Sequence, residues 1–250
     1  MVFIDSHCHL EMLSDIDLVI ARARNNDVKI IVYNSINRET MDYSLKLADK
    51  YKEIKVALGV YPIDAIKLSE KEFTFDIDYI KKNRKKIIAI GEVGIDLKES
   101  KDFLTQKKNL ILFINLAKDL DLPLIIHSRG AEEKVIEILE QEKAKKVIMH
   151  CFCGNFKLVD KIVLNGWTLT IPTNVTFSEH FQKVVTRVPI ENLLCETDSP
   201  FLHPIKGQRN NEPCNIIESY KMIAKIKRLN LKETEKIIES NFKNLFNYSI

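Results

Sequence analysis

Eight short apolar runs rich in Ile and Val recur along the 250-residue chain, and they limit the folds that it can adopt. Their first residues lie 21 to 36 positions apart. Runs of this length and composition are typical of strands that are buried on both faces of a sheet. The predicted strands cover residues 2–5, 29–34, 55–60, 86–91, 122–126, 146–149, 167–171 and 192–195.

Segments with helical periodicity separate these runs. The period is clear at 103–117 and 135–139, and we expect two closing helices at 215–226 and 232–245. Alternation of strand and helix predicts a parallel sheet. Eight such units in about 250 residues predict a TIM (β/α)8 barrel, with a doubly wound open sheet as the alternative. Because composition does not shift along the chain, we expect one domain over residues 1–250.

The composition is that of an ordinary globular protein, with 45% hydrophobic and 29% charged residues. A net charge of +3 argues against a dedicated nucleic-acid-binding surface but permits an anionic substrate. We find neither an apolar run of the roughly 18 residues that a membrane helix needs nor a secretory leader. We therefore expect no membrane association, a cytoplasmic location and reduced thiols for the five cysteines.

Residue types that bind metals stand at the ends of five of the eight runs, in the stretches 5–9, 91–96, 127–129, 150–152 and 196–200. In a barrel, the carboxyl ends of all strands converge on one face, where active sites form. The side chains of these stretches should therefore surround one space. The metal-ligand candidates are His7, His9, Glu92, His127, His150 and Asp198.

His7 and His9 are two residues apart on a predicted strand, so their imidazoles should point the same way and suit a divalent metal. Six candidates, two of them carboxylates, exceed the needs of one tetrahedral ion. They suit two ions about 3.5–4 Å apart with a bridging carboxylate. The alternative is that they are polar caps of strand ends, but ligand types at five ends favour metal. Cys151 and Cys153 lack the second pair that a zinc finger requires.

Taken together, these stretches resemble the TatD family of metal-dependent hydrolases, within the wider amidohydrolase-like barrels. The resemblance implies a TIM barrel, two divalent ions and hydrolysis, most often of DNA phosphodiesters. It also implies that His7, His9 and Asp198 hold one ion, that His127 and His150 hold the second, and that Glu92 bridges them. The matching stretches are DSHCHL (5–10), IGEVGID (90–96), LPLIIHSR (122–129), HCFCG (150–154), ETDSPFL (196–202) and RNNEP (209–213).

The chain departs from the family pattern near the third run. The family usually has two histidines where this chain has Tyr61 and Ile63, and an aromatic residue where it has Leu97. None of these is a ligand candidate, but we expect them near the site. The departures therefore bear on substrate preference.

The expected mechanism is attack on phosphorus by a water molecule that the ions activate. We assign catalytic roles to Asp198, which would orient the water or move its proton, and to Glu92. Asp96 and Glu196 follow runs that carry ligands, so they could orient ligand imidazoles from behind. Asp5 shares the face of His7 and has either this role or a buried structural one.

Two arginines are candidates for binding substrate phosphate, because a guanidinium matches two phosphate oxygens. They are Arg129 and Arg209, and for each an ordinary salt bridge is an equal alternative. Glu212 is a possible partner for Arg209. The basic run 81–86 precedes a strand, so it should lie on the face opposite the ligands. DNA should then be held weakly, which favours an exonuclease acting on single-stranded ends.

The function predicted from these residues is a metal-dependent deoxyribonuclease. A metal-dependent amide or ester hydrolase, such as a D-aminoacyl-tRNA deacylase, is the first alternative, and a non-catalytic binding barrel is a remote one. The ions could be Mg²⁺, Mn²⁺ or Zn²⁺, because histidine ligands favour softer metals while the resemblance suggests magnesium.

Overall fold

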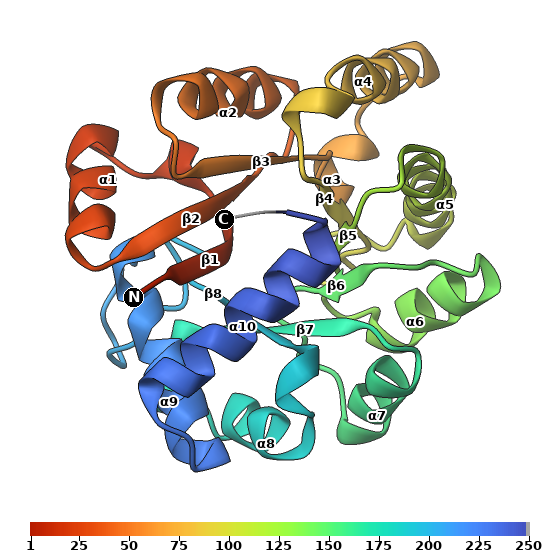
Figure 1. Cartoon of the computed structure of the whole chain (residues 1–250). Helices are drawn as coiled ribbons and strands as arrows, with labels where there is room; N and C mark the ends of the chain where they lie inside the picture. Colours follow the sequence, from red (N-terminus) through yellow and green to blue (C-terminus); the bar gives the residue numbers. More distant parts are fainter. Residues whose placement is uncertain (249–250) are drawn as a thin grey trace.

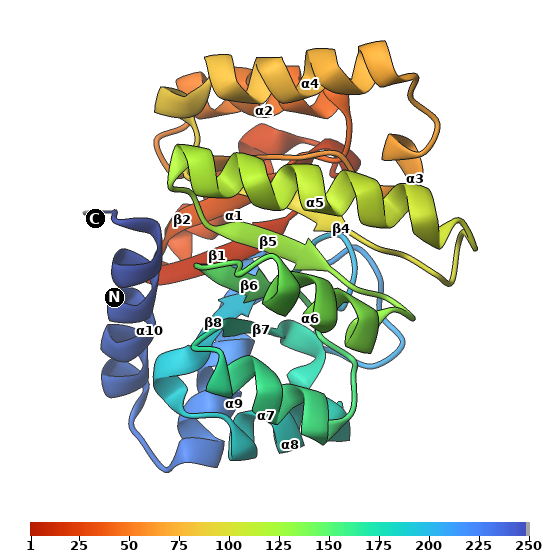
Figure 2. The same cartoon turned by 90° about the vertical axis from the view of Figure 1, so that its right-hand side faces the viewer.

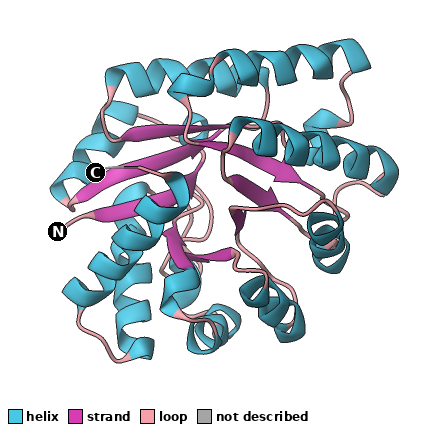
Figure 3. Cartoon of the chain, turned by 45° about the vertical axis from the view of Figure 1, so that its right-hand side comes forward, coloured by secondary structure: helices cyan, strands magenta, loops and turns pink. Residues whose placement is uncertain are grey.

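The computed structural model describes residues 1–248 and contains eight parallel strands in one sheet. Each strand is hydrogen-bonded to the next in sequence order, and helices surround the sheet (Figures 1 and 3). The strands are β1 (Phe3–Cys8), β2 (Val28–Asn34), β3 (Ile54–Leu58), β4 (Ala89–Gly94), β5 (Leu124–His127), β6 (Val147–Met149), β7 (Thr168–Pro172) and β8 (Leu193–Glu196).

This topology confirms the predicted TIM barrel and all eight predicted strands. A doubly wound sheet is excluded, because its strand order would depart from the sequence order. The largest shifts of a boundary are three residues. β1 continues to Cys8 beyond its predicted end at 5, and β4, predicted at 86–91, starts at Ala89 because Arg84–Lys86 form a short 3-10 helix before it. The last two positions of the predicted domain, 249–250, lie outside the described residues.

Ten α-helices of the described chain cover the outside of the sheet and continue beyond β8 (Figure 1). The predicted helices at 103–117, 135–139, 215–226 and 232–245 are confirmed as α5, α6, α9 and α10. None of the helices within residues 1–248 is both long and apolar enough to cross a membrane. The helices are α1 (Ile16–Asn25), α2 (Arg38–Lys50), α3 (Pro62–Ala65), α4 (Glu70–Lys82), α5 (Phe103–Leu120), α6 (Glu132–Gln141), α7 (Phe156–Leu164), α8 (Glu179–Arg187), α9 (Ile217–Lys227) and α10 (Leu231–Phe246).

The last helix covers the amino ends of the strands. Figure 2 shows α10 on one side of the barrel, with the strand arrows pointing away from it. The Asn241 side chain, on α10, donates to the carbonyls of Ile190 and Leu193 at 2.7 and 2.9 Å, which fixes the helix at the start of β8. The carboxyl ends of the strands therefore form the face of the barrel that α10 leaves uncovered.

The barrel closes between β8 and β1 mainly through polar side chains and loop backbone. The Asp5 carboxylate, on β1, accepts from the Thr197 backbone N–H at 2.8 Å and from its hydroxyl at 2.5 Å. Ser6 Oγ donates to the Cys195 carbonyl at 2.7 Å, and the Asp198 N–H donates to the His7 carbonyl at 2.9 Å. Burial raises the pKa of Asp5 to about 8. The sequence left two roles open for Asp5, orienting a ligand imidazole or a buried structural role, and these contacts favour the structural one.

Glycines allow β3, β4 and β5 to approach closely under the site. A Cβ atom on Gly59 would lie 2.6 Å from the Gly91 carbonyl carbon, and one on Gly94 would lie 1.9 Å from the His127 carbonyl oxygen. Gly94 also has φ +149°, a conformation that side chains disfavour. The close approach of β4 to β5 therefore requires glycine at this position.

Replacing this glycine tests that requirement. Gly94→Ala should destabilise the protein by roughly 3 kcal/mol, because the methyl group must displace the β5 backbone at His127. Gly166→Ala is the control, since Gly166 also has positive φ, +70°, but nothing lies within 4 Å of its added Cβ. Urea unfolding measures both free energies. Equal losses in the two variants would show that the close approach imposes no constraint.

Candidate metal centre

Irregularities in two strands direct ligand candidates into the mouth of the barrel. The pairing of β4 with β5 shifts between Ile90 and Val93, so β4 carries one extra residue beside Glu92. The pairing of β1 with β2 also shifts between Asp5 and Cys8, so β1 carries one extra residue in the stretch that contains His7. An inserted residue reverses the faces to which the following side chains point. These bulges therefore determine which residues face the cavity.

The first group of ligand atoms gathers around one oxygen of Glu92. The Nε2 atoms of His7 and His9 lie 3.1 Å apart, and they lie 3.5 and 3.4 Å from Glu92 Oε2. Asp198, just after β8, places Oδ1 at 3.6 Å from His7 Nε2 and 3.5 Å from His9 Nε2. Three strands far apart in sequence thus bring four ligand atoms to one point.

The second group gathers around the other oxygen of the same carboxylate. His127, at the end of β5, places Nδ1 at 2.8 Å from Glu92 Oε1. His150, just after β6, places Nε2 at 3.8 Å from the same oxygen. The two oxygens of Glu92 therefore face two separate sets of imidazoles.

The separations between imidazoles and carboxylate oxygens in the first group fit a shared metal ion, whereas His127 Nδ1 lies within hydrogen-bonding distance of Glu92 Oε1. Ligand bonds of about 2.1 Å place neighbouring atoms of a tetrahedral site about 3.4 Å apart, close to the separations in the first group. Direct N–H···O hydrogen bonds are about 2.7–3.2 Å long, shorter than the 3.4–3.6 Å between these imidazoles and the oxygens of Glu92 and Asp198. His7, His9 and Asp198 could hold an ion, as could Glu92, His127 and His150, since the ligand atoms of each set all lie within 4.8 Å of one another.

Asp96 and Glu196 lie behind two of these imidazoles. Asp96 Oδ2 is 3.0 Å from His127 Nε2, and Glu196 Oε2 is 2.7 Å from His150 Nδ1. If the nitrogen that faces Glu92 binds an ion, the other nitrogen of each ring can donate to its carboxylate. This arrangement orients ligand histidines in many metal sites.

The charges of the site depend on one another. Burial alone would raise the pKa of the Glu92 carboxyl, but the imidazoles of His127 and His7 outweigh it and hold that pKa well below its usual value. Burial lowers the pKa of His7, and repulsion from His150 adds to this effect. For His9, Asp198 and Glu92 outweigh burial and raise the pKa to about 9.

His150 is also protonated near neutral pH when no ion is present. Burial opposes its charge, but Glu196 and Asp198 overcome this and raise its pKa to about 10. The pKa of Asp198 is lowered, because the charge of His150 outweighs the effect of burial. The site thus has charged carboxylates at Glu92 and Asp198, and His9 and His150 hold protons in place of cations while burial disfavours a proton on His7.

The predicted phosphate-binding arginines have different surroundings. Arg129 Nε donates to Asp96 at 2.7 Å, and its guanidinium also contacts Glu99, so the salt-bridge alternative is what the structure shows. Arg209 is exposed in the loop after β8. The possible pairing of Arg209 with Glu212 does not form, because Glu212 faces α1 and its carboxylate accepts from Arg22 at 2.6 and 2.8 Å.

The sequence reasoning missed the role of Asn211, in the middle of RNNEP. Asn211 is fully buried, and its side chain donates to the Thr197 carbonyl and to Thr173 Oγ1, both at 2.9 Å. Its backbone N–H donates to the Pro200 carbonyl at 2.9 Å. Asn211 therefore fixes the loop that follows Asp198. An amide beside charged residues gave no signal that it would be buried.

Tyr61 stands where the family pattern has a histidine, and it contacts Asp96. Its hydroxyl donates to Asp96 Oδ2 at 2.7 Å, and its ring packs edge-on against His127 with centroids 5.1 Å apart. Asp96 thus receives bonds from Tyr61, Arg129 and His127. Tyr61 lies beside the ligand groups and holds the carboxylate that orients one of them.

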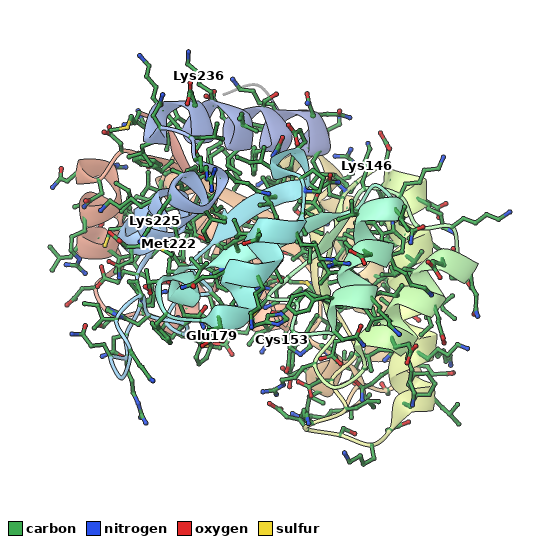
Figure 4. The ribbon with its side chains drawn as sticks, turned by 90° about the horizontal axis from the view of Figure 1, so that it is seen from below. Lys146, Cys153, Glu179, Met222, Lys225 and Lys236 are labelled. Atoms are coloured by element: carbon green, nitrogen blue, oxygen red, sulfur yellow. The ribbon has the colours of Figure 1, made fainter. Side chains whose placement is uncertain are left out.

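A pocket of about 540 Å³ opens over the ligand groups. It lies on the uncovered face of the barrel. In Figure 4, Cys153, which lines it, lies toward the edge opposite Lys236 on α10. A cavity of this size is typical of sites for small ligands. Its lining residues are His9, Met12, Ile36, Tyr61, Glu92, Glu99, His127, Ser128, Arg129, Glu132, His150, Cys151, Cys153, Asp198, Phe201 and Leu202.

Comparison with known proteins finds relatives along the whole chain. A family model described as TatD related DNase matches residues 4–247. The chain is 36% identical over 242 residues to an uncharacterized metal-dependent hydrolase of Methanocaldococcus jannaschii, covering 96% of this chain and 94% of that protein. It is 31% identical over 260 residues to the deoxyribonuclease TATDN3 of Homo sapiens, covering 97% and 94%.

Solved structures agree with this relationship. The TatD homologue YJJV from Escherichia coli superposes with a TM-score of 0.89 at 25% identity, covering 99% of this chain and 98% of that one. A dihydroorotase from Campylobacter jejuni, at 14% identity and a TM-score of 0.64, shares only the fold. On the strength of the family match and these relatives, the chain belongs to the TatD family of metal-dependent hydrolases.

Proposed function

We propose that this hydrolase is a deoxyribonuclease that uses two divalent ions. The observation that carries the proposal is the position of Glu92, whose two oxygens face separate ligand groups and would bridge two ions. Paired ions are typical of enzymes that cleave phosphodiesters. The name of the human relative, a deoxyribonuclease, supports the same chemistry.

The side chains of the site would have separate roles in the reaction. Bound ions would lower the pKa of a water molecule and offset charge on the phosphate. Asp198, at the edge of the first ligand group, would orient the attacking water and accept its proton. Asp96 and Glu196 would hold His127 and His150 in place, so that neither ring rotates as charge moves.

The charge distribution favours a strand end over a long duplex. The basic run 81–86 lies at the end of α4 and before β4, at the amino ends of the strands. Within residues 1–248, Arg129 is the one lysine or arginine that lines the pocket, together with the acidic residues Glu92, Glu99, Glu132 and Asp198. Few phosphates can be bound outside the ions, so contact with DNA should be weak and sensitive to salt. We therefore infer exonuclease action on single-stranded ends.

Metal removal tests this function. Chelator-stripped protein should not shorten end-labelled single-stranded DNA, and addition of Mg²⁺, Mn²⁺ or Zn²⁺ should restore progressive shortening. Glu92→Gln should reduce activity to background and weaken binding of at least one ion, because the bridging charge is lost while the size is kept. Gel assays and inductively coupled plasma analysis measure the two effects.

Glu132→Gln is the matched control, because it removes a carboxylate of the same pocket that is outside the ligand groups. It should keep its ions, and circular dichroism should show both variants folded. Full activity in Glu92→Gln would rule out the assigned centre. Hydrolysis of an aminoacyl-tRNA ester without any shortening of DNA would favour the deacylase alternative.

Metal binding should release protons. His9 and His150 have pKa values of about 9 and 10, so they are protonated at pH 7.5 and must lose a proton to bind an ion. Apparent affinity should therefore rise with pH until these pKa values are passed. Calorimetry at pH 7.5 in buffers with different ionisation enthalpies counts the released protons.

The control for this measurement removes the carboxylate that most strongly raises the pKa of His150. Glu196→Gln should lower that pKa, so fewer protons are released on binding. Proton release near zero in the unchanged protein, or an affinity that is constant from pH 6 to 9, would contradict the assignment of these histidines as ligands.

Arg209 would bind a phosphate away from the ions. Because it is exposed on the loop after β8 and does not line the pocket, Arg209→Ala should raise KM severalfold with little change in kcat. The slope of log affinity against log salt should fall by about one. Arg228→Ala, at the end of α9, is the control. An unchanged KM for every length of DNA would exclude this contact.

A further inference from the structure

Two large apolar side chains are exposed beside the polar ligand groups. Phe201 is 51% exposed and Met12 is 44% exposed, and both line the pocket that contains Asp198 and His9. Met12 follows His9 by three residues, and Phe201 follows Asp198 by three. Both therefore adjoin the first ligand group, that of His7, His9 and Asp198. Exposed apolar surface at a polar site indicates contact with an apolar part of a ligand.

The loop that carries Phe201 is fixed in place. The Phe201 N–H donates to the Asp198 carbonyl at 2.8 Å. On either side of Phe201, the Pro200 carbonyl accepts from Asn211 at 2.9 Å and the Leu202 carbonyl accepts from Thr173 Oγ1 at 2.6 Å. The backbone on which Phe201 stands is thus held at three successive residues, by Asn211, Asp198 and Thr173. Because this loop is already ordered, little conformational entropy of the protein is lost when a ligand contacts it.

The charges of the pocket show where binding energy must come from. Arg129 is engaged by Asp96 and Glu99, so its charge is already largely compensated. Glu132, also in the lining, adds negative charge that repels a polyanion. Bound ions can attract the phosphate that reacts, but the pocket offers little to the neighbouring phosphates. Within the pocket, the rest of the nucleotide is therefore left to contacts that do not depend on its charge.

We propose that Phe201 and Met12 form a subsite for one unpaired nucleobase, next to the phosphodiester that is cleaved. This inference rests on the proposed function and names the part of the substrate that the site recognises. A phenyl ring stacks on any base, because every base has a π face, and the thioether of Met12 suits an aromatic edge. Bases inside a duplex have both faces covered by their neighbours. The subsite therefore selects frayed or single-stranded ends with little preference for sequence.

Substrates with and without the base test the subsite. Single-stranded oligonucleotides would carry either a normal or an abasic nucleotide at the labelled end. Phe201→Ala should lower kcat/KM on the normal end about tenfold, or about 1.4 kcal/mol, which is within the range for stacking on one base. The kcat/KM of the unchanged protein should be lower by a similar factor on the abasic end than on the normal end. The kcat/KM of Phe201→Ala should be nearly the same on both ends. Phe201→Trp should retain activity on the normal end.

Phe75→Ala is the control, because Phe75 is 63% exposed on α4 and does not line this pocket. Anisotropy with phosphorothioate oligonucleotides, in the presence of the activating ion, measures binding separately from cleavage. Cleavage that does not depend on the base, or an equal loss in Phe201→Ala on both ends, overturns the subsite. Binding that depends on the base and on Phe201, without cleavage, supports the subsite and rejects the deoxyribonuclease activity. If the protein neither binds nor cleaves these oligonucleotides, both the subsite and the deoxyribonuclease activity are rejected.

Discussion

The buried carboxylate of Glu92 is the interaction on which the site depends. It is 2% exposed, and its oxygens face His7 and His9 on one side and His127 and His150 on the other. A carboxylate removed from water is costly unless positive charge surrounds it. Without ions, protonated imidazoles supply that charge, and ions would supply it more strongly. The four histidines, which come from three strands, are thus held around one negative group by the same electrostatics that would attract metal.

The barrel supports this arrangement at a second level. Asp96 and Glu196 each fix an imidazole, and they are themselves held: Asp96 by Tyr61, Arg129 and the N–H groups of Lys98 and Glu99, and Glu196 by the Cys151 N–H at 3.0 Å. The bonds of Asp5 to Thr197 close the barrel one residue before Asp198. The surroundings of His127, His150 and Asp198 are therefore each held by a separate set of polar contacts.

The sequence was sufficient to predict the fold because strand and helix periods were regular. It also predicted that the ligand candidates would meet in one place, because they stand at the ends of those strands. It could not predict the bulge at Glu92, since an inserted residue does not alter which residues are apolar. It also left the partner of Glu212 open, because the partner of a loop residue depends on how the loop folds back, here onto Arg22 of α1. The role of Asn211 was not predicted for a related reason. An amide side chain is buried only where backbone groups are placed to bond with it, and their placement is a property of the folded loop.

The departure at Tyr61 can now be interpreted in physical terms. A tyrosine hydroxyl 2.7 Å from Asp96 donates to the carboxylate that orients His127, and its ring lies against that histidine. Burial and the Asp96 charge raise the pKa of Tyr61, so the hydroxyl keeps its proton and remains a donor across the physiological range. Tyr61 therefore contributes a neutral hydrogen-bond donor to Asp96, the carboxylate behind His127. Tyr61 therefore shapes the pocket wall beside the ligand groups without itself being a ligand candidate, so substitution there can alter the fit of a substrate while the six candidates keep their positions.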